Sequence, residues 1–371
     1  MRVLELSISG YRNLNKVNIN PSPGVNFIYG KNAQGKTNLI EAVWMFTGAR
    51  SFRGTKDSDL VDFSKDSAKL EGKFFLEKRE QNISVFFGNG KRKAFLNGVA
   101  QPYPTKIIGK FRVILFSPIH LSLVSGGPEA RRKFLDAAIC QLKPTYISHI
   151  SKNNQILKQR NALLKNFSMD SDSVFLEVLD EKLAQTGSVI VTERLKYFEF
   201  LKKEAVRIYS EISGNSETME MNYIPSFSKS VSSQSSLECV KDKIFMKLKK
   251  SSNSDIKSGH TSFGPHKDEL EIFIDGKKVR LFGSQGQQRS AALCLKLAEA
   301  HVLKEFCNEA PVILLDDVMS ELDDFRKNYL ISRINENQVF ITDCDSEMSK
   351  KFKSGKLFEV NAGKVQEISE F

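Results

Sequence analysis

The sequence predicts an α/β protein: a mixed sheet with an antiparallel β subdomain, joined to an α-helical lobe. Three observations predict this class. Near the N-terminus, the glycine-rich segment GKNAQGKT lies between a short apolar run and a helical segment. Two long segments with helical periodicity occupy the middle of the chain. A second apolar run near the C-terminus ends in two carboxylates. The 371 residues exceed what one small core usually holds, so we expect two lobes.

The composition indicates a globular protein with a basic surplus. Hydrophobic residues make up 40% of the chain and charged residues 27%. Lys and Arg total 55 against 44 Asp and Glu, a net charge of +11, which favours a nucleic acid or an anionic membrane as partner, or only a solvated basic surface. The five cysteines form no CxxC pair, and no apolar run reaches the ~18 residues that cross a bilayer. We therefore expect a cytoplasmic protein.

The N-terminal third has the pattern of strands around one helix. Residues 2–9 alternate between polar and apolar, and 25–29 form a second apolar run. A helix is expected from residue 36 to about 46. Residues 68–100 predict an antiparallel meander, because Asn89-Gly90 and Asn97-Gly98 are hairpin-turn dipeptides. Residues 111–118 predict a buried strand.

The middle of the chain has helical periodicity. Segments 128–166 and 173–212 predict two long helices joined by a polar linker, 168–172. Plain bundle packing and a short coiled coil both remain open for this lobe. The serine-rich segments 226–236 and 251–258 predict loops.

The C-terminal third returns to strands. The segment HKDELEIFIDGKKVRLFG predicts a hairpin that turns at Asp275-Gly276. A helix from 286 to about 306 follows, then strands in PVILLDDV and QVFITDCD. We expect residues 1–127 and 259–371 to form the two halves of one lobe, and residues 128–258 to form the helical lobe.

The segment from Gly30 to Thr37 matches the nucleotide-binding pattern GxxxxGK[ST] without exception. Its glycines allow backbone N–H groups to surround phosphates, and the helix that follows favours negative charge at its start. Lys36 would reach the β- and γ-phosphates, and the Thr37 hydroxyl would bind Mg²⁺. The candidate nucleotide-binding residues are Gly30, Lys31, Asn32, Ala33, Gln34, Gly35, Lys36, Thr37 and Asn38.

The apolar run 312–315 predicts a buried strand that delivers Asp316 and Asp317 beside the phosphates. Asp316 would hold Mg²⁺ directly or through water. Asp317 stands where a water-activating carboxylate belongs. A solvated acidic turn is the alternative, which the nearby phosphate motif disfavours. Lys36, Asp316 and Asp317 are the candidate catalytic residues.

The segment Ser284-Gln285-Gly286-Gln287-Gln288-Arg289 begins a helix and predicts either a second anion site or an ordinary N-cap. It precedes the acidic strand, and Ser320-Glu321-Leu322-Asp323 follows that strand. This order resembles the signature motif and SxLD loop of ATP-binding-cassette (ABC) ATPases. The resemblance implies an ABC-type P-loop ATPase head. It also implies that Ser284, Gly286 and Gln287 contact an ATP held by a second copy, so that ATP closes a homodimer.

Over nearly its whole length the chain resembles the bacterial RecF recombination and repair proteins, relatives of the structural-maintenance-of-chromosomes (SMC) ATPases. The residues that carry this resemblance are Gly10–Leu14, Thr37–Ala42, Arg50–Arg53, Phe116–Pro118, Gly126–Pro128, Arg131–Asp136, Gly264–Asp268, SQGQQR and LLDDVMSELD.

The resemblance implies a weak, DNA-dependent ATPase that uses ATP and Mg²⁺ in DNA replication, recombination and repair, including the SOS response. It implies binding to double-stranded DNA and to gaps where single and double strands meet, with RecO- and RecR-like mediators that help to load RecA. Arg50–Arg53 would contact the nucleotide. Arg131 and Arg132 would serve DNA or a dimer interface, or lie on a solvated helix face.

Three departures from the wider ABC pattern matter. Gln285 replaces the first glycine of the transporter LSGGQ pattern, although it suits RecF-like sequences. Asp317 replaces the usual Glu, so we expect slow hydrolysis. Thr342 and Asp343 stand where transporters place a switch histidine, which disfavours a transporter-like switch.

Other nucleotide-dependent classes fit less well. A transporter ATPase subunit would have a much shorter interval between Lys36 and Ser284. An ABC-type ATPase of a DNA-processing nuclease complex is the second hypothesis, although the histidines form no HxH or HxxxH set. A small-molecule kinase would not use the SQGQQR segment, and GTP use would call for an NKxD motif. For His266 the sequence supplies no mechanism; a capped turn is the simplest interpretation.

Overall fold

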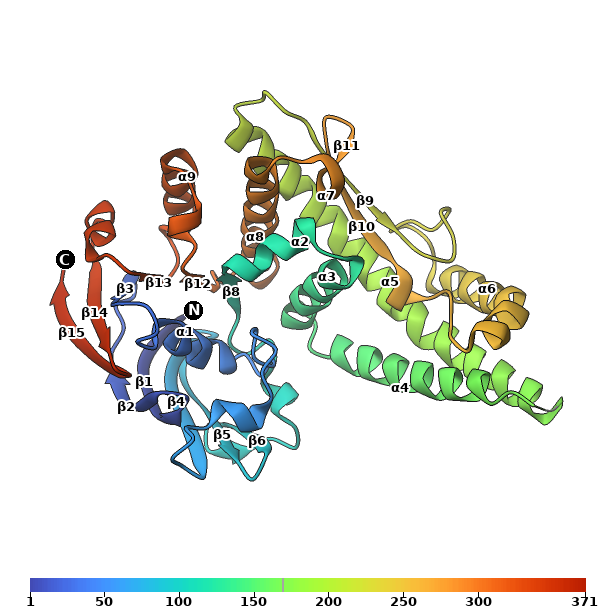
Figure 1. Ribbon diagram of the computed structural model, residues 1–371, viewed down its shortest axis with the longest axis horizontal. Coiled ribbons are helices and arrows are strands. Elements are labelled where there is room, and N and C mark those ends of the chain that lie inside the picture. Colours follow the sequence, from blue (N-terminus) through green and yellow to red (C-terminus); the bar gives the residue numbers. More distant parts are fainter. Residues whose placement is uncertain (169) are drawn as a thin grey trace. The chain divides into compact units, whose positions relative to one another are not determined.

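The computed structural model describes residues 1–168 and 170–371, which form two compact units (Figure 1). Unit 1 comprises Met1–His120 and Glu299–Phe371, and unit 2 comprises Leu121–Ala298. Residue 169, part of the predicted linker 168–172, lies outside the described residues. Within them, no helix is both long and apolar enough to cross a bilayer.

Unit 1 is built on two six-stranded sheets. One is antiparallel, with the order β2-β1-β4-β5-β6-β7, and the other is mixed, with the order β15-β14-β3-β13-β12-β8. In the mixed sheet all pairs are parallel except β14–β15. The predicted α/β class, with a mixed sheet and an antiparallel subdomain, is confirmed.

The strands of the antiparallel sheet are β1 (Arg2–Tyr11), β2 (Leu14–Ile19), β4 (Ser67–Leu76), β5 (Arg79–Gly88), β6 (Lys91–Leu96) and β7 (Val99–Ala100). Those of the mixed sheet are β3 (Val25–Tyr29), β8 (Val113–Phe116), β12 (Val312–Asp316), β13 (Val339–Asp343), β14 (Gly355–Asn361) and β15 (Lys364–Glu370).

Helix α1 (Lys36–Met45) contributes to the core that the two sheets share. Buried residues of α1, such as Leu39 and Ile40, belong to one hydrophobic cluster with residues of both sheets. At the helix end, the Phe46 and Phe74 rings meet edge to face with centroids 5.1 Å apart. Helix α1 is thereby packed into the core between residues of both sheets.

Unit 2 is mainly helical. Its helices are α2 (Ser122–Ser125), α3 (Pro128–Leu142), α4 (Tyr146–Lys165), α5 (Asp170–Ser213), α6 (Leu237–Ser258), α7 (Val279–Phe282) and the part of α8 (Gln285–Cys307) up to Ala298. Helices α4 and α6 both pack against the long α5 (Figure 1). The predicted single helix 128–166 is wrong: it is broken between α3 and α4, because Pro144 disfavours helical backbone at the residue before it.

A three-stranded sheet, β11-β10-β9, completes unit 2. Strand β10 (Glu269–Ile274) turns into the short β11 (Lys277–Lys278), as the predicted hairpin requires, but the residues after it form α7 instead of a longer strand. Its other neighbour is β9 (Met219–Ile224). This pairing explains why residues 259–298 cluster with unit 2, a boundary that differs from the predicted one after residue 258.

The predicted loop at 251–258 is wrong, because this segment forms the last turns of α6. Ser251 and Asp255 face the interior of unit 2, where Asp255 is fully buried. The helix ends only at Gly259, whose φ of 71° is the left-handed conformation typical of a C-terminal cap. Serine content alone gave the wrong prediction, since serine is only mildly unfavourable within a helix.

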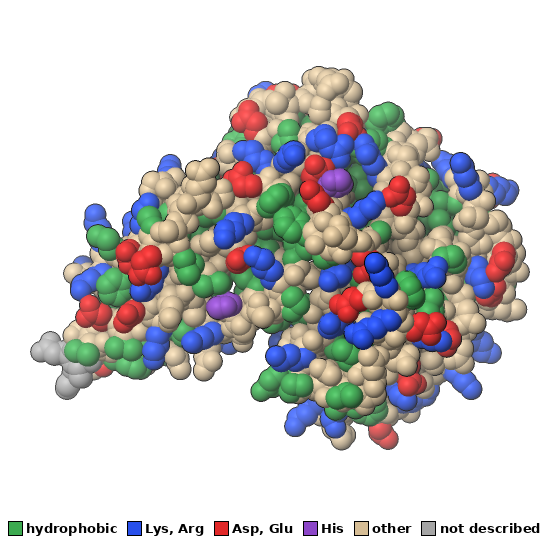
Figure 2. Space-filling model, turned by 180° about the vertical axis from the view of Figure 1, so that it is seen from behind, with side chains coloured by type: hydrophobic (Ala, Val, Ile, Leu, Met, Phe, Trp, Pro, Cys, Tyr) green, Lys and Arg blue, Asp and Glu red, His purple; other side chains and the backbone are tan. Residues whose placement is uncertain are grey.

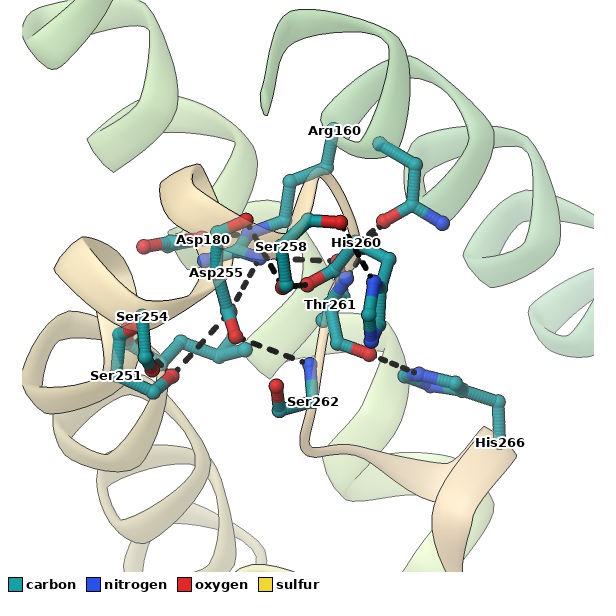
Figure 3. Close-up of polar contacts among 12 residues, drawn as sticks. Arg160, Asp180, Ser251, Ser254, Asp255, Ser258, His260, Thr261, Ser262 and His266 are labelled. Carbon is teal, nitrogen blue, oxygen red and sulfur yellow. Dashed lines mark hydrogen bonds and ion pairs between the residues drawn. The ribbon is translucent and has the colours of Figure 1, made fainter. Parts of the chain in front are cut away.

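A buried arginine explains why Asp255 is inside (Figure 3). Arg160 of α4 donates from Nε to Asp180 Oδ1 of α5 at 2.5 Å, and from Nη1 to Asp255 Oδ2 at 2.8 Å. Nη1 also donates to Thr261 Oγ1 at 2.9 Å. Burial raises the pKa of Asp180 above its ordinary value. One guanidinium therefore joins α4, α5 and α6 with the segment after α6.

Candidate nucleotide-binding site

The mixed sheet brings three loops of unit 1 to one edge. Strands β3, β13 and β12 are parallel neighbours, so their carboxyl ends lie together. The register pairs Tyr29 with Asp343 and Asp316 with Thr342. The glycine-rich loop, the acidic residues and the residues after β13 are distant in sequence, and they meet at this edge.

The loop between β3 and α1 has a backbone that only glycine adopts easily at two positions. Gly30 has φ 153° and Gly35 has φ 117°. A Cβ at Gly30 would lie 2.3 Å from the Val360 carbonyl oxygen, and a Cβ at Gly35 would lie 2.7 Å from Asn13 Oδ1. Between them, residues 31–33 are exposed to solvent. A loop of this conformation followed by a helix start could surround a bound anion with backbone N–H groups.

Lys36 lies inside this loop. Its Nζ donates to the Gly30 carbonyl at 2.5 Å and to the Lys31 carbonyl at 3.1 Å. It also donates to Cys344 Sγ at 3.6 Å, and the same thiol donates to Asn32 Oδ1 at 2.9 Å. The sequence analysis gave Cys344 no role at this site. Its position directly after β13 becomes informative only when the pairing of β13 with β3 is known.

Asp316 ends β12 with its side chain almost fully buried. Its Oδ1 accepts from Thr37 Oγ1 and from Thr342 Oγ1, both at 3.0 Å. Burial, more than any other influence, raises the pKa of this carboxyl; the two threonine hydrogen bonds act against the shift. The Thr37 hydroxyl and the Asp316 carboxylate lie together, and hard oxygen donors of this kind suit Mg²⁺.

Asp317 stands beyond Asp316, exposed to solvent. Its backbone adopts φ 54°, and its N–H donates to Thr342 Oγ1 at 3.0 Å. Ser320 Oγ donates to Asp317 Oδ1 at 3.3 Å. Thr342 therefore orients both members of the acidic pair, a role that its position in the sequence did not indicate.

Behind the loop lies a polar cluster that sequence reasoning missed. Glu41 of α1 is fully buried, and Arg12 binds both of its oxygens, from Nε at 2.5 Å and from Nη2 at 3.0 Å. Ser51 Oγ also donates to Glu41 Oε1. The Arg12 guanidinium reaches Thr55 Oγ1 at 2.7 Å as well. This cluster ties the β1–β2 turn and the segment after α1 to the helix that begins at the loop.

The predicted nucleotide contacts at 50–53 separate into different environments. Arg53 Nη1 donates to Asn38 Oδ1 at 2.9 Å, so this side chain lies against the first turn of α1. Arg50 is exposed and Ser51 is buried. Asn13 Nδ2 donates to the Gln34 carbonyl at 3.0 Å and supports the loop from the β1–β2 turn.

In unit 2, the segment that begins with Ser284 forms the exposed start of α8. Ser284 N–H donates to Gln287 Oε1 at 2.9 Å, and Gln287 N–H donates to Ser284 Oγ at 3.2 Å. This reciprocal pair is a capping box. Gln287 Nε2 also donates to Glu217 Oε1 at 2.8 Å. The Gln287 amide is therefore engaged within unit 2, whereas Ser284 and Gln285 are exposed.

Two other motifs of unit 2 have interior contacts. Arg131 is only 3% exposed and binds both oxygens of Glu269, so the predicted solvated face is wrong for it. Arg132 Nη1 donates to the Asp268 carbonyl at 2.7 Å. The His266 ring hydrogen-bonds from Nε2 to the Thr261 carbonyl at 3.2 Å, and burial lowers its pKa to about 4. His266 is a neutral, half-buried side chain that supports the fold.

Comparison with known proteins identifies this arrangement. The family model described as the RecF/RecN/SMC N-terminal domain matches residues 2–367. The "DNA replication and repair protein RecF" of Oceanobacillus iheyensis is 38% identical, over 98% of this chain and 100% of that protein. The chain belongs to the RecF family. A RecF protein of Lactobacillus johnsonii is 37% identical over 98% of the chain and 99% of its own length.

Solved structures of the RecF family agree. A recombination mediator protein RecF bound to ATPrS, described as acting in the RecFOR pathway, has 36% identity and a TM-score of 0.91, with 99% of this chain and 98% of that chain covered. The SMC head of Pyrococcus furiosus bound to a ScpA domain has 16% identity and a TM-score of 0.57, over 100% and 96% of the two chains. The second likeness concerns the fold alone. The family model and the RecF structures together with it confirm the predicted ABC-type ATPase head.

Proposed function

We propose that this protein is an ATP-dependent, dimerising DNA-binding clamp of recombinational repair. In this proposal ATP binds to the loop 30–37 of one copy and is covered by the Ser284 helix start of another. The dimer encloses or grips DNA, and slow hydrolysis of ATP releases it. The RecF relatives described as RecF–ATP and RecF–ATPrS support the choice of nucleotide.

The geometry of unit 1 supports the nucleotide contacts. The loop offers backbone N–H groups of Gly30–Thr37, with Lys31, Asn32 and Ala33 at its exposed crest and Gln34 half-buried beside them. Lys36, now bonded to loop carbonyls, would turn to the β- and γ-phosphates. Asn38 sits between Asn13 and Arg53 and would support the phosphates from the side.

Thr37 and Asp316 would hold Mg²⁺, which supplies charge neutralisation on the phosphates when it is bound. Asp317 would orient the attacking water and accept its proton. Its side chain is exposed and one methylene shorter than that of Glu, so it would position the attacking water less well. These features support slow hydrolysis. We propose that DNA stimulates it and that ATP acts as a timer.

The single observation that carries the dimer is the exposed start of α8. A helix start presents unpaired N–H groups and a partial positive charge, which favour an anion. Here Ser284 is exposed, and the helix begins at Gln285 and Gly286 without an acidic residue in its first turn. The γ-phosphate of an ATP held by a second copy fits this chemistry. By the symmetry of a homodimer, two such sites would close together.

The charge of the chain supports DNA as the partner. The net charge is +11. This surplus favours contacts to a phosphate backbone. Figure 2 shows Lys and Arg side chains spread over the visible face among acidic ones. We propose double-stranded DNA, including junctions with single-stranded gaps, as the ligand. RecR- and RecO-like mediators would act with the clamp to load the recombinase.

The proposal is tested by measuring the size of the protein with and without ATP, for the wild type, Lys36→Met and Ser284→Arg. We expect an ATP-dependent shift to a dimer in the wild type. Lys36→Met should lose ATP binding and the shift together. Ser284→Arg should bind ATP and remain a monomer, since the new side chain fills the space of the γ-phosphate. If the wild type binds ATP without any change in size, the clamp mechanism is wrong.

A second measurement addresses the DNA. Affinity for a gapped duplex should be higher with ATP than without it. The affinity for DNA should fall steeply as salt rises from about 50 to about 200 mM, because phosphate contacts release counterions. If the affinity for DNA changes neither with ATP nor in Ser284→Arg, DNA binding does not depend on dimerisation, and the clamp is contradicted.

A further inference from the structure

The start of α8 is connected to the long helix α5 by a short series of hydrogen bonds. Tyr209, near the end of α5, donates its hydroxyl to Glu217 Oε2 at 2.5 Å. Glu217 Oε1 accepts from Gln287 Nε2 at 2.8 Å, and Gln287 Oε1 accepts from Ser284 N–H at 2.9 Å. Both oxygens of Glu217 are thus used, one toward α5 and one toward α8.

A carboxylate accepts hydrogen bonds and donates none, and this fixes the Gln287 amide. With its NH₂ group held by Glu217, Gln287 must present its oxygen to Ser284 N–H. The opposite orientation would set two acceptors against each other at Glu217 and two donors against each other at Ser284 N–H. The correct orientation also leaves the Gln287 N–H on Ser284 Oγ, at 3.2 Å. Glu217 therefore determines which way the capping box of α8 closes.

This arrangement decides which groups of the helix start remain for a ligand. The N–H groups of Ser284 and Gln287 are taken by the capping box. Those of Gln285 and Gly286 belong to the first turn of α8, which has no intrahelical acceptors. They lie at the exposed end of the helix with the Ser284 hydroxyl. An anion would meet this small, oriented set of donors.

We propose that Glu217 is a positioning residue of the composite ATP site: it orients Gln287 and, through it, the donors of the Ser284 helix start that contact the γ-phosphate. Tyr209 anchors Glu217 from α5. Tyr209 is 1% exposed, and burial together with its bond to Glu217 raises its pKa, so it remains a donor at neutral pH. This inference rests on the proposed dimer, in which the helix start of one copy completes the site of the other.

The test compares Glu217→Ala, Glu217→Gln and Gln287→Ala in the full-length protein. Glu217→Ala removes the acceptor and lets the Gln287 amide rotate. We expect about a tenfold loss at each composite site, the usual scale for one hydrogen bond to a charged group. Two sites close in each dimer, so its dissociation constant with ATP should rise about a hundredfold. Combining Glu217→Ala with Gln287→Ala should add little, because both act through the same contact.

Glu217→Gln distinguishes positioning from charge. The amide oxygen of the new side chain can accept from Gln287, and its NH₂ can donate to the Tyr209 hydroxyl, which also accepts. Dimerisation should therefore stay within about threefold of the wild type, on the scale of a retained neutral hydrogen bond. Glu220→Ala is the matched control: Glu220 is an exposed carboxylate on β9, three positions further along.

Two measurements separate this inference from the proposed function. ATP affinity of the monomer, which depends on the loop of unit 1, should be the same in every variant. Hydrogen exchange at the Ser284 and Gln287 amides should accelerate about tenfold in Glu217→Ala, whether or not a dimer forms. If the wild type never dimerises, the proposed function fails. The exchange rates alone then test whether Glu217 orients Gln287. Unchanged exchange, or a Glu217→Ala dimer as tight as that of Glu220→Ala, would overturn the inference.

Discussion

Replacing Arg160 by leucine should destabilise unit 2 strongly and in a pH-dependent way. The change leaves Asp180 and Asp255 facing each other's charge in the interior, where their side chains are 4% and 0% exposed. Breaking a buried ion pair by removing one partner usually costs about 3–5 kcal/mol. Asp255 keeps hydrogen bonds from Ser251 Oγ at 3.3 Å and from Ser262 N–H at 3.2 Å, which compensate it in part. We therefore expect a loss of about 4 kcal/mol near pH 7.5.

The sign of the pH dependence follows from the carboxyl groups. In the wild type, burial already raises the pKa of Asp180, although Arg160 opposes the shift. Without the Arg160 guanidinium, the pKa of Asp180 in the folded state rises further above its value in the unfolded chain. The folded variant then binds more protons than the unfolded chain, so its stability falls as pH rises through that interval. The loss should be about 2 kcal/mol smaller at pH 5 than at pH 7.5, from ~1.4 kcal/mol per pH unit.

Urea denaturation followed by circular dichroism at both pH values measures this loss. Arg207→Leu is the control, because Arg207 is 42% exposed and pairs with Glu204 and Glu211 on its own helix. It should cost less than about 1 kcal/mol at either pH. Equal losses in the two variants, or an Arg160→Leu loss that does not change with pH, would refute the reasoning.

Three further outcomes are expected. Between pH 6.5 and about 4 the free energy of unfolding of the wild type should fall as pH falls. The reason is that His266 gains a proton in the unfolded chain, whereas burial lowers its pKa to about 4 in the folded chain. In urea denaturation, His266→Leu should reduce this dependence on pH by up to about 1 kcal/mol per pH unit. Gly30→Ala should weaken ATP binding at least about tenfold in calorimetry, as the new Cβ meets a β14 carbonyl at 2.3 Å, whereas Gly90→Ala, with nothing within 4 Å, should bind normally. Thr342→Val should slow ATP turnover about tenfold with little change in ATP affinity, since it removes the hydroxyl that orients Asp316.

Local parts of the site were predictable because their elements are contiguous in sequence. The run from residue 25 to residue 46 contains a strand, a loop and a helix in order, and the structure places β3 and α1 at those positions. The acidic strand and the helix after Ser284 were predictable for the same reason. In each case the periodicity and the end signals lie within one short window.

Contacts that close over long separations could not be predicted. Thr342 bonds to Asp316 because β13 pairs with β12, and Cys344 reaches Lys36 because β13 also pairs with β3. Nothing in the sequence near these residues states that pairing. The helical ending of α6 was missed for a related reason. Its serine content is typical of a loop, and the residue that holds Asp255 inside is Arg160, which lies on another helix.

Unit 2 relies on buried charge in a consistent way. Arg160 joins α4 to α5 and α6, and Arg194 of α5 binds Asp136 of α3 at 2.8 Å. Arg131 of α3 binds Glu269 of β10 at 2.9 Å. Such pairs add little net stability over well-packed apolar residues, but they penalise any other alignment of the elements that carry them. We therefore attribute to them the alignment of these elements within unit 2.

The hydrogen bond between Glu217 and Gln287 lies nearer the surface than these pairs, since both of its side chains are half-buried. Strand β9 follows directly on the loop that carries Glu217, and it pairs with the same β10 that Arg131 fixes to α3. The direction in which the α8 start presents its donors thus depends on polar contacts that extend through the interior of unit 2. In the proposed clamp, two ATP molecules hold the dimer, so that direction should be set before the partner arrives, since any reorientation afterwards would subtract from the binding energy.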